Sequence, residues 1–184
     1  MFFCSNRVDK GGEFLLSSEK WLVKRAQKGD GEAFVKLIEQ YENVLYGIAK
    51  RYLGIEDAAD VLQDTILIAF EEIGNLKQPQ YFHTWITKIL INQSYNLIKK
   101  NNKFSYNYSD NHQKLLVEDC EEGLELENLI SKLDPVYRVP ILLYYYSGFS
   151  YKEISIIIGE PLGTVKSRIF RGKAWLKKEY TKGD

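Results

Sequence analysis

The chain has 184 residues, of which 45% are hydrophobic and 27% are charged, and its formal net charge is zero. This composition is typical of a soluble globular protein, no apolar run approaches the roughly 20 residues of a membrane span, and the opening residues lack a secretory signal, so we expect a cytoplasmic protein. Two cysteines and two histidines, widely spaced, predict neither a disulfide framework nor a metal site, and we expect no cofactor.

Residues 1–18 precede the first long helical pattern, and we assign no role to this N-terminal extension. It contains Gly-Gly-Glu-Phe at positions 11–14, the signature of diguanylate cyclases. That active site lies on a hairpin within a large α/β domain, whereas only ten residues precede the motif here and no alternating strand pattern follows. The sequence therefore argues against this enzyme class.

A first helical domain is predicted over residues 19–103, where apolar residues recur three and four positions apart. Gly-Asp-Gly at 29–31 separates the first two helices, and Gly54 ends the second. The third helix begins near Asp57 and runs to about Ile73. After a break that contains Pro79, the fourth helix is predicted from about Thr84 to Lys100.

Three aspartates, Asp57, Asp60 and Asp64, recur at helical spacing in the third helix. One hypothesis makes them magnesium ligands or half of a di-metal centre, but the sequence offers no second acidic cluster and no Glu-x-x-His partner to complete such a site. A solvated acidic face is the simplest alternative. A face that docks on a basic protein surface needs only the residues present.

The fourth helix carries a strip of aromatic, amide and basic side chains. Charge changes sign at this point, because residues 54–73 hold six acids and no base, and residues 74–103 hold five bases and no acid. A helical projection places one set of residues together: Trp85, Lys88, Asn92, Tyr95, Asn96 and Lys99. Rings stack on bases, amides bond to base edges and lysines follow phosphates, so this face predicts single-stranded DNA binding. A core position remains the alternative for Trp85 and for the preceding Phe82.

Residues 104–122 are polar, Asn-rich and acidic without a sustained period, and we interpret them as a linker. Helical patterns resume in a second domain over residues 123–184, with a stop at Asp134-Pro135. No convincing strand pattern appears. The sequence thus predicts an all-α fold of two small helical domains joined by a flexible linker.

The second domain carries a helix-turn-helix pattern. Ser150 and Glu153 form a capping box, residues 159–161 provide a tight turn, and a second helix begins at Gly163. On that helix Arg171 shares the polar face with two hydroxyl residues, which suits base contacts in the major groove. Seven residues make up this candidate duplex surface: Ser150, Thr164, Lys166, Ser167, Arg168, Arg171 and Lys173. The alternative is an amphipathic helix whose basic face is merely solvated.

Taken together, these segments resemble bacterial sigma factors of the extracytoplasmic function group over the chain from about Glu19. The third-helix run over residues 57–65 is similar to the family's core-polymerase-binding helix. Residues 82–86 with Asn92 are similar to its promoter-melting and minus-ten segment. Residues 148–154 and 163–168 are similar to its helix-turn-helix.

This resemblance implies a dissociable initiation subunit that is not an enzyme and has no small-molecule substrate. Residues 19–103 would be sigma region 2 and residues 123–184 sigma region 4. The implied partners are core RNA polymerase, promoter DNA in duplex and melted form, and an anti-sigma factor, in many relatives bound to the membrane, that controls a stress or envelope response.

The resemblance also implies three sets of site residues. The polymerase would contact Asp57, Asp60, Gln63 and Asp64. The loop over residues 76–81, with Asn92 and Asn96, would capture a flipped base, within a minus-ten surface of Tyr81, Phe82, Trp85, Lys88, Asn92, Asn96 and Lys99. The minus-thirty-five element would be read by the seven residues of the duplex surface named above.

Two departures from the family pattern stand out. Asn96 occupies a position where an acid is common. Gly172 replaces an alanine, and we expect this glycine to weaken the second helix of the helix-turn-helix by up to about 1 kcal/mol.

A different class of function, a stand-alone helix-turn-helix regulator that binds duplex DNA without polymerase, is the runner-up hypothesis.

Overall fold

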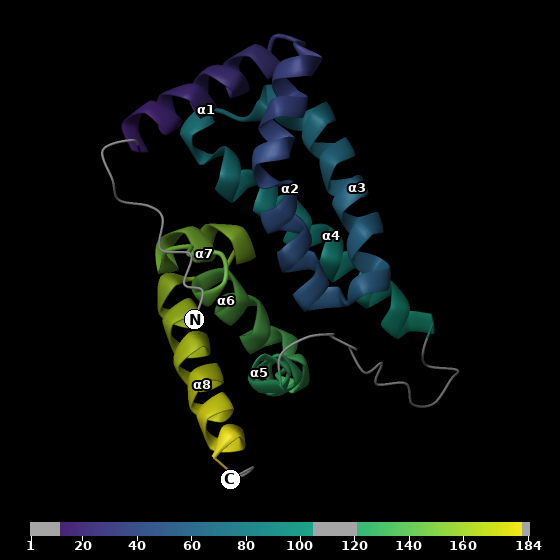
Figure 1. The fold of residues 1–184 in the computed structure, drawn as a ribbon, viewed down its shortest axis with the longest axis vertical. Coiled ribbons are helices and arrows are strands. Elements are labelled where there is room, and N and C mark those ends of the chain that lie inside the picture. The colour runs from purple at the N-terminus through teal and green to yellow at the C-terminus, as the bar shows by residue number, and fades with distance from the viewer. Residues whose placement is uncertain (1–11, 105–120, 182–184) are drawn as a thin grey trace.

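The computed structural model describes residues 12–104 and 121–181, and every regular element in these ranges is helical (Figure 1). The elements are α1 (Gly12–Ala26), α2 (Gly31–Leu53), α3 (Ile55–Glu72), the short 3-10 turns η1 (Ile73–Asn75) and η2 (Pro79–Tyr81), α4 (Phe82–Phe104), α5 (Glu121–Lys132), α6 (Pro135–Tyr145), α7 (Tyr151–Ile158) and α8 (Leu162–Tyr180). The prediction of an all-α chain is confirmed. Within these ranges no helix is long and apolar enough to cross a bilayer.

The N-terminal bundle is organised around α2, which packs against α1, α3 and α4. Local signals set its ends. Asp30 caps α2, because its carboxylate accepts a hydrogen bond from the Ala33 amide at 3.0 Å. Gly54, at a φ of 103°, makes the abrupt turn between α2 and α3 that a residue with a Cβ would resist.

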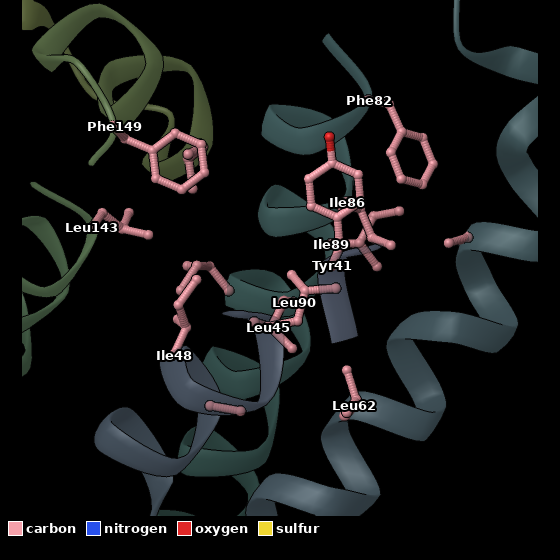
Figure 2. Close-up of a cluster of buried hydrophobic side chains, with 14 of the residues drawn as sticks. Tyr41, Leu45, Ile48, Leu62, Phe82, Ile86, Ile89, Leu90, Leu143 and Phe149 are labelled. Atoms are coloured by element: carbon pink, nitrogen blue, oxygen red, sulfur yellow. The ribbon is translucent and has the colours of Figure 1, made fainter. Parts of the chain in front are cut away.

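The predicted apolar stripes converge in the middle of this bundle (Figure 2). Leu45 of α2 and Ile86 and Leu90 of α4 are fully buried, and Tyr41 packs against the ring of Phe82. The core also contains two side chains with hydroxyl groups. Thr65 and Ser94 are fully buried and each donates to the carbonyl four residues earlier, which satisfies the hydroxyl within its own helix.

In the C-terminal bundle, α8 packs against α5, α6 and α7. Gly172 is buried at the contact with α6, where an added Cβ would lie 2.5 Å from Ile141 Cδ1 and 3.2 Å from Tyr137 Cβ. The sequence led us to expect that this glycine only weakens α8. Its missing side chain instead permits the close approach of the two helices, which the local sequence pattern did not reveal.

The two bundles pack directly against each other through a stack of three rings. The His83 ring, at the start of α4, lies between Tyr41 of α2 and Phe149, with centroid distances of 4.9 and 4.4 Å. Phe149 and Leu143 are buried at this boundary and belong to the same continuous core as the N-terminal bundle (Figure 2). The sequence predicted two domains joined by a linker but not this shared core.

A second contact between the bundles is electrostatic. The Arg51 guanidinium of α2 lies 3.5 Å from the Glu127 carboxylate of α5 and over the ring of Tyr146, 4.5 Å from its centroid. Burial raises the pKa of Tyr146, and the nearby arginine partly offsets this shift. The phenol is therefore neutral at physiological pH and offers an uncharged ring to the cation.

Candidate nucleic-acid interface

The exposed face of α3 carries the acidic residues singled out from the sequence. Asp60, Gln63 and Asp64 are exposed and Asp57 is half-buried. An open groove of about 320 Å³ separates this face from α4, and its lining comprises Asp57, Asp60, Val61, Asp64, Gln93, Asn96, Leu97 and Lys100. The carboxylates of α3 thus face two amides and a lysine of α4 across one groove, so that the two predicted binding surfaces meet at their edges.

The metal hypothesis for these aspartates finds no geometric support. Within the described part of the chain, no three side chains of histidine, cysteine, aspartate or glutamate come together in a way that could hold a metal ion. Carboxylates that recur along one helix at the side of an open groove lack the convergence that a divalent cation requires. The arrangement instead suits a negatively charged docking face.

The polar strip of α4 is exposed over its central turns. Lys88, Asn92, Asn96 and Lys99 are exposed, and Tyr95 shows 59% of its surface to solvent. The opposite side of the helix, with Ile86, Leu90 and Ser94, is fully buried, as the helical projection predicted. These exposed residues provide one ring face, amide donors and acceptors, and two cations on a single surface.

At the beginning of α4 the structure separates three aromatic residues that the sequence grouped together. Tyr81 is 50% exposed, Trp85 is half-buried, and Phe82 is 0% exposed. The Phe82 ring packs between Tyr41, at 5.6 Å, and Trp85, at 5.8 Å. In this arrangement Phe82 has no surface to offer a base, and the core position left open by the sequence is the one it occupies.

The turn into α7 is built by the predicted capping box, which is confirmed. The Glu153 amide donates to Ser150 Oγ at 3.3 Å, and the Ser150 amide donates to the Glu153 carboxylate at 2.8 Å. Gly159, in the left-handed conformation, ends α7. The helix-turn-helix geometry is therefore fixed at both ends of its first helix, although the Ser150 hydroxyl is occupied by this cap.

The face of α8 opposite its core is polar and basic. Lys166, Ser167, Arg171 and Lys173 are exposed, and Thr164 is half-buried. Arg168 differs from the other basic residues: its guanidinium is 2.9 Å from the Glu160 carboxylate and its side chain is 24% exposed. This arginine connects α8 to the preceding turn, so part of the hydrogen-bonding capacity of its guanidinium is already used by Glu160 in the free protein.

Phe170 lies on the same face and was missed by the sequence analysis. It is 75% exposed, the most exposed large apolar side chain of the described residues, and it follows Lys166 by one helical turn. A large apolar residue within a polar helical face was the available signal. In a groove-binding helix such a ring is suited to contact with a thymine methyl group.

Two family models match the chain, one in each bundle. The model described as "Sigma-70 region 2" matches residues 37–104, and the model described as "Sigma-70, region 4" matches residues 123–176. The first covers most of α2 together with α3 and α4. The second covers the helix-turn-helix and most of α8, so the matches contain the three surfaces described above.

Curated relatives match over most of their length. The chain is 30% identical to the ECF RNA polymerase sigma-E factor of Haemophilus influenzae, over 87% of this chain and 94% of that protein. It is 32% identical to the ECF RNA polymerase sigma factor SigW of Bacillus subtilis, over 85% and 94%.

Solved structures share the fold. The chain superimposes with a TM-score of 0.72 on CnrH in complex with the cytosolic domain of CnrY, at 23% identity, covering 91% of this chain and 99% of that one. The TM-score is also 0.72 for the sigma factor RpoE in complex with the anti-sigma factor NepR from Bartonella quintana, at 22% identity, covering 79% and 94%. The region matches and the identity to curated relatives establish that the chain belongs to the extracytoplasmic function (ECF) sigma factors of RNA polymerase.

Proposed function

We propose that this sigma factor docks on core RNA polymerase through α3, receives the melted minus-ten element on α4, and reads the minus-thirty-five element as duplex with α8. The observation that carries this assignment is that three exposed surfaces differ from one another in charge and in the types of side chain they present. One surface is acidic, one combines amides, rings and lysines, and one is a basic face of a helix-turn-helix. Each matches a different partner.

The acidic surface is suited to a protein partner. Asp60 and Asp64 are exposed, and the whole segment 54–73 carries six acids and no base. Such a surface repels nucleic acid at short range, whereas a basic protein patch would be attracted and oriented by it. We therefore assign core polymerase to this face, with Gln63 and the half-buried Asp57 at the same contact.

The strip on α4 is suited to separated strands. Tyr95 can stack on a base, while Asn92 and Asn96 present donors and acceptors to base edges. The loop over residues 76–81 lies at the start of the same helix and is a candidate to receive a flipped base. Lys88 and Lys99 lie on the same exposed strip, where they can follow the phosphates.

The face of α8 is suited to duplex DNA. Arg171 can donate two hydrogen bonds to a guanine in the major groove, and Ser167 and Thr164 lie nearer the start of the helix, where base edges are reached first. Lys166 and Lys173 are assigned to phosphates. Because phosphate contacts carry no sequence information, we assign specificity to Arg171, Ser167 and Phe170.

A further partner follows from the solved relatives, one of which is held by an anti-sigma factor. We infer that an anti-sigma factor controls this chain as well, in a stress or envelope response, and that the protein works in the cytoplasm, where polymerase and promoters are found. As an initiation subunit it would perform no catalysis and use no small-molecule substrate. The alternative, a regulator that binds duplex DNA without polymerase, is disfavoured by the family.

The docking assignment is tested by reversing charge on α3. The variant Asp60→Arg with Asp64→Arg is compared with Glu39→Arg with Glu42→Arg, a matched pair of exposed acids on α2. We expect affinity for core polymerase to fall about 100-fold or more in the first variant, because two attractive contacts become repulsive, and to stay within about twofold in the control.

The readouts are association with sigma-free core enzyme and transcription in vitro from candidate promoters. The wild-type chain should confer accurate starts on core polymerase and bind duplex DNA weakly by itself. Tight, sequence-specific duplex binding without core enzyme would favour the stand-alone regulator. Unchanged association of the α3 variant with core enzyme would contradict the docking assignment.

A further inference from the structure

The segment that precedes α4 is fastened to the end of α1 by one side chain. The Gln27 amide nitrogen Nε2 donates to the Ile73 carbonyl at 3.0 Å and to the Leu76 carbonyl at 2.8 Å. Both hydrogen bonds are partly buried, and both acceptors belong to the backbone that leads into the loop over residues 76–81. Together with the burial of Ile73 and Leu76 in the core, these two hydrogen bonds fix the position where this loop begins.

Gln27 lies in a turn that is itself stabilised by hydrogen bonds. The backbone amide of Gln27 continues the last turn of α1 by donating to the Val23 carbonyl at 2.9 Å. Across the turn, Arg25 Nε donates to the Asp30 carboxylate at 2.6 Å. The hydrogen bond from the Ala33 amide, followed by that from Arg25, lowers the pKa of Asp30, so the carboxylate stays ionised and the brace persists at neutral pH.

Beyond the two pinned carbonyls the loop turns outward. Ile73 and Leu76 are buried, whereas Lys77, Gln78 and Tyr81 are exposed. A hydrogen bond within the loop, from the Tyr81 amide to the Gln78 carbonyl at 3.0 Å, closes it just before α4. The exposed residues are thus held between an anchored start and an anchored end.

Fixing a loop in advance matters because ordering its backbone costs conformational entropy, and a site that is ordered before its ligand arrives binds more selectively. A base leaving the DNA stack has to find hydrogen-bonding groups already in place. Gln27 contributes to this order at the start of the loop, because both protons of its Nε2 are donated to the Ile73 and Leu76 carbonyls.

We propose that Gln27 is a positioning residue for minus-ten recognition, which holds the loop over residues 76–81 in the conformation that receives an extruded base. This inference rests on the proposed role of that loop. It assigns the turn after α1 to the promoter-reading apparatus, although the family match for region 2 begins only at residue 37. A merely structural tie between α1 and the bundle is the competing explanation.

The test uses the full chain with three substitutions. Gln27→Met keeps the length of the side chain and removes both donors, Gln27→Lys keeps donors, and Gln40→Met is the control at an exposed glutamine of α2. In the first measurement, hydrogen exchange of the Leu76 and Tyr81 amides should become about tenfold faster in Gln27→Met, because the loop opens more often. Gln27→Lys and the control should stay close to wild type.

The second measurement uses the holoenzyme and two promoters that differ at one minus-ten base which the wild type distinguishes. The ratio of initiation rates should fall about fivefold in Gln27→Met and recover in Gln27→Lys, because a displaced loop loses base selection before it loses general affinity. The added charge of lysine cancels in this ratio, since both templates carry the same phosphates. A structural tie would lower both rates and leave the ratio unchanged.

Unchanged exchange in Gln27→Met would overturn the proposal, and so would faster exchange with an unchanged ratio. A wild-type chain that fails to direct initiation would instead overturn the proposed function. The exchange measurement, made on the free chain, would still report whether the glutamine holds the loop.

Discussion

The two helices assigned to DNA, α4 and α8, are embedded in the molecule in different ways. α4 packs against α2 and α3 on one side and against α7 of the other bundle, so that only a strip along its length is exposed. α8 buries one narrow face, formed by Val165, Ile169 and Gly172, and exposes most of its remaining surface along the outside of the molecule (Figure 1).

This difference separates two modes of recognition. A helix enters the major groove, about 12 Å wide, only if its outer face protrudes from its own domain, as the outer face of α8 does. α4 is covered by α2, α3 and α7, so that it is less accessible to the walls of a major groove than α8. We therefore propose that the amides and rings of α4 meet a separated strand laid along the surface, and that α8 meets duplex DNA.

The strongest test of the enclosed character of α4 is Phe82→Ala. Because this ring is fully buried between Tyr41 and Trp85, its removal should lower the free energy of unfolding by about 3 to 5 kcal/mol. The change is measured by urea denaturation of the full chain. Phe82→Leu, which keeps most of the volume, should cost less than about 1.5 kcal/mol and leave transcription with core enzyme intact.

The same pair of variants decides between the core position of Phe82 and the DNA contact suggested by its family resemblance. A Phe82→Leu protein that is stable and binds polymerase but cannot open a promoter would show that the ring itself touches DNA. The core of α4 would then have to rearrange during melting.

A second prediction separates the two helices by the DNA they need. Arg171→Ala should weaken discrimination between correct and altered duplex sites by about 1 to 3 kcal/mol, because a bidentate base contact is lost. Asn92→Ala with Asn96→Ala should leave duplex discrimination unchanged and weaken binding to a pre-melted template. Holoenzyme binding to matched duplex and pre-melted promoters measures both effects.

Two results would contradict this division of roles. Equal weakening of Arg171→Ala on all sequences would reduce Arg171 to a phosphate contact. An asparagine variant that loses duplex binding as strongly as pre-melted binding would mean that α4 meets paired DNA, despite its enclosure by α2, α3 and α7.

The features that local sequence determines could be predicted. The third helix was expected to end near Ile73 and ends at Glu72, and the capping box at Ser150 forms as expected. The buried side of α4, with Ile86 and Leu90, follows from a period of about 3.6 residues. The three binding surfaces were identified from charge and side-chain type, and their roles stay predictions.

Features that depend on distant segments could not be predicted. A helical period shows that a face is apolar, but not which distant residue covers it, and so the stacking of His83 on Phe149 and the complete burial of Phe82 were not foreseen. The two hydrogen bonds of Gln27 belong to the same class, since their acceptors lie far along the chain. The domain limits, including the linker over residues 104–122, stay predictions, because residues 105–120 lie outside the described part of the chain.

The smallest effect we predict compares two glycines of α8. At Gly163 an added Cβ meets no atom within 4 Å, so Gly163→Ala should raise the free energy of unfolding by up to about 1 kcal/mol through helix propensity. At Gly172 the same gain is offset by overpacking against Ile141 and Tyr137, which costs about 1 to 3 kcal/mol, so Gly172→Ala should be destabilised by up to about 2 kcal/mol. Urea denaturation of both variants measures the difference. Equal stabilisation would mean that α6 and α8 separate easily, and that the exposed position of α8 does not rest on its close packing against α6.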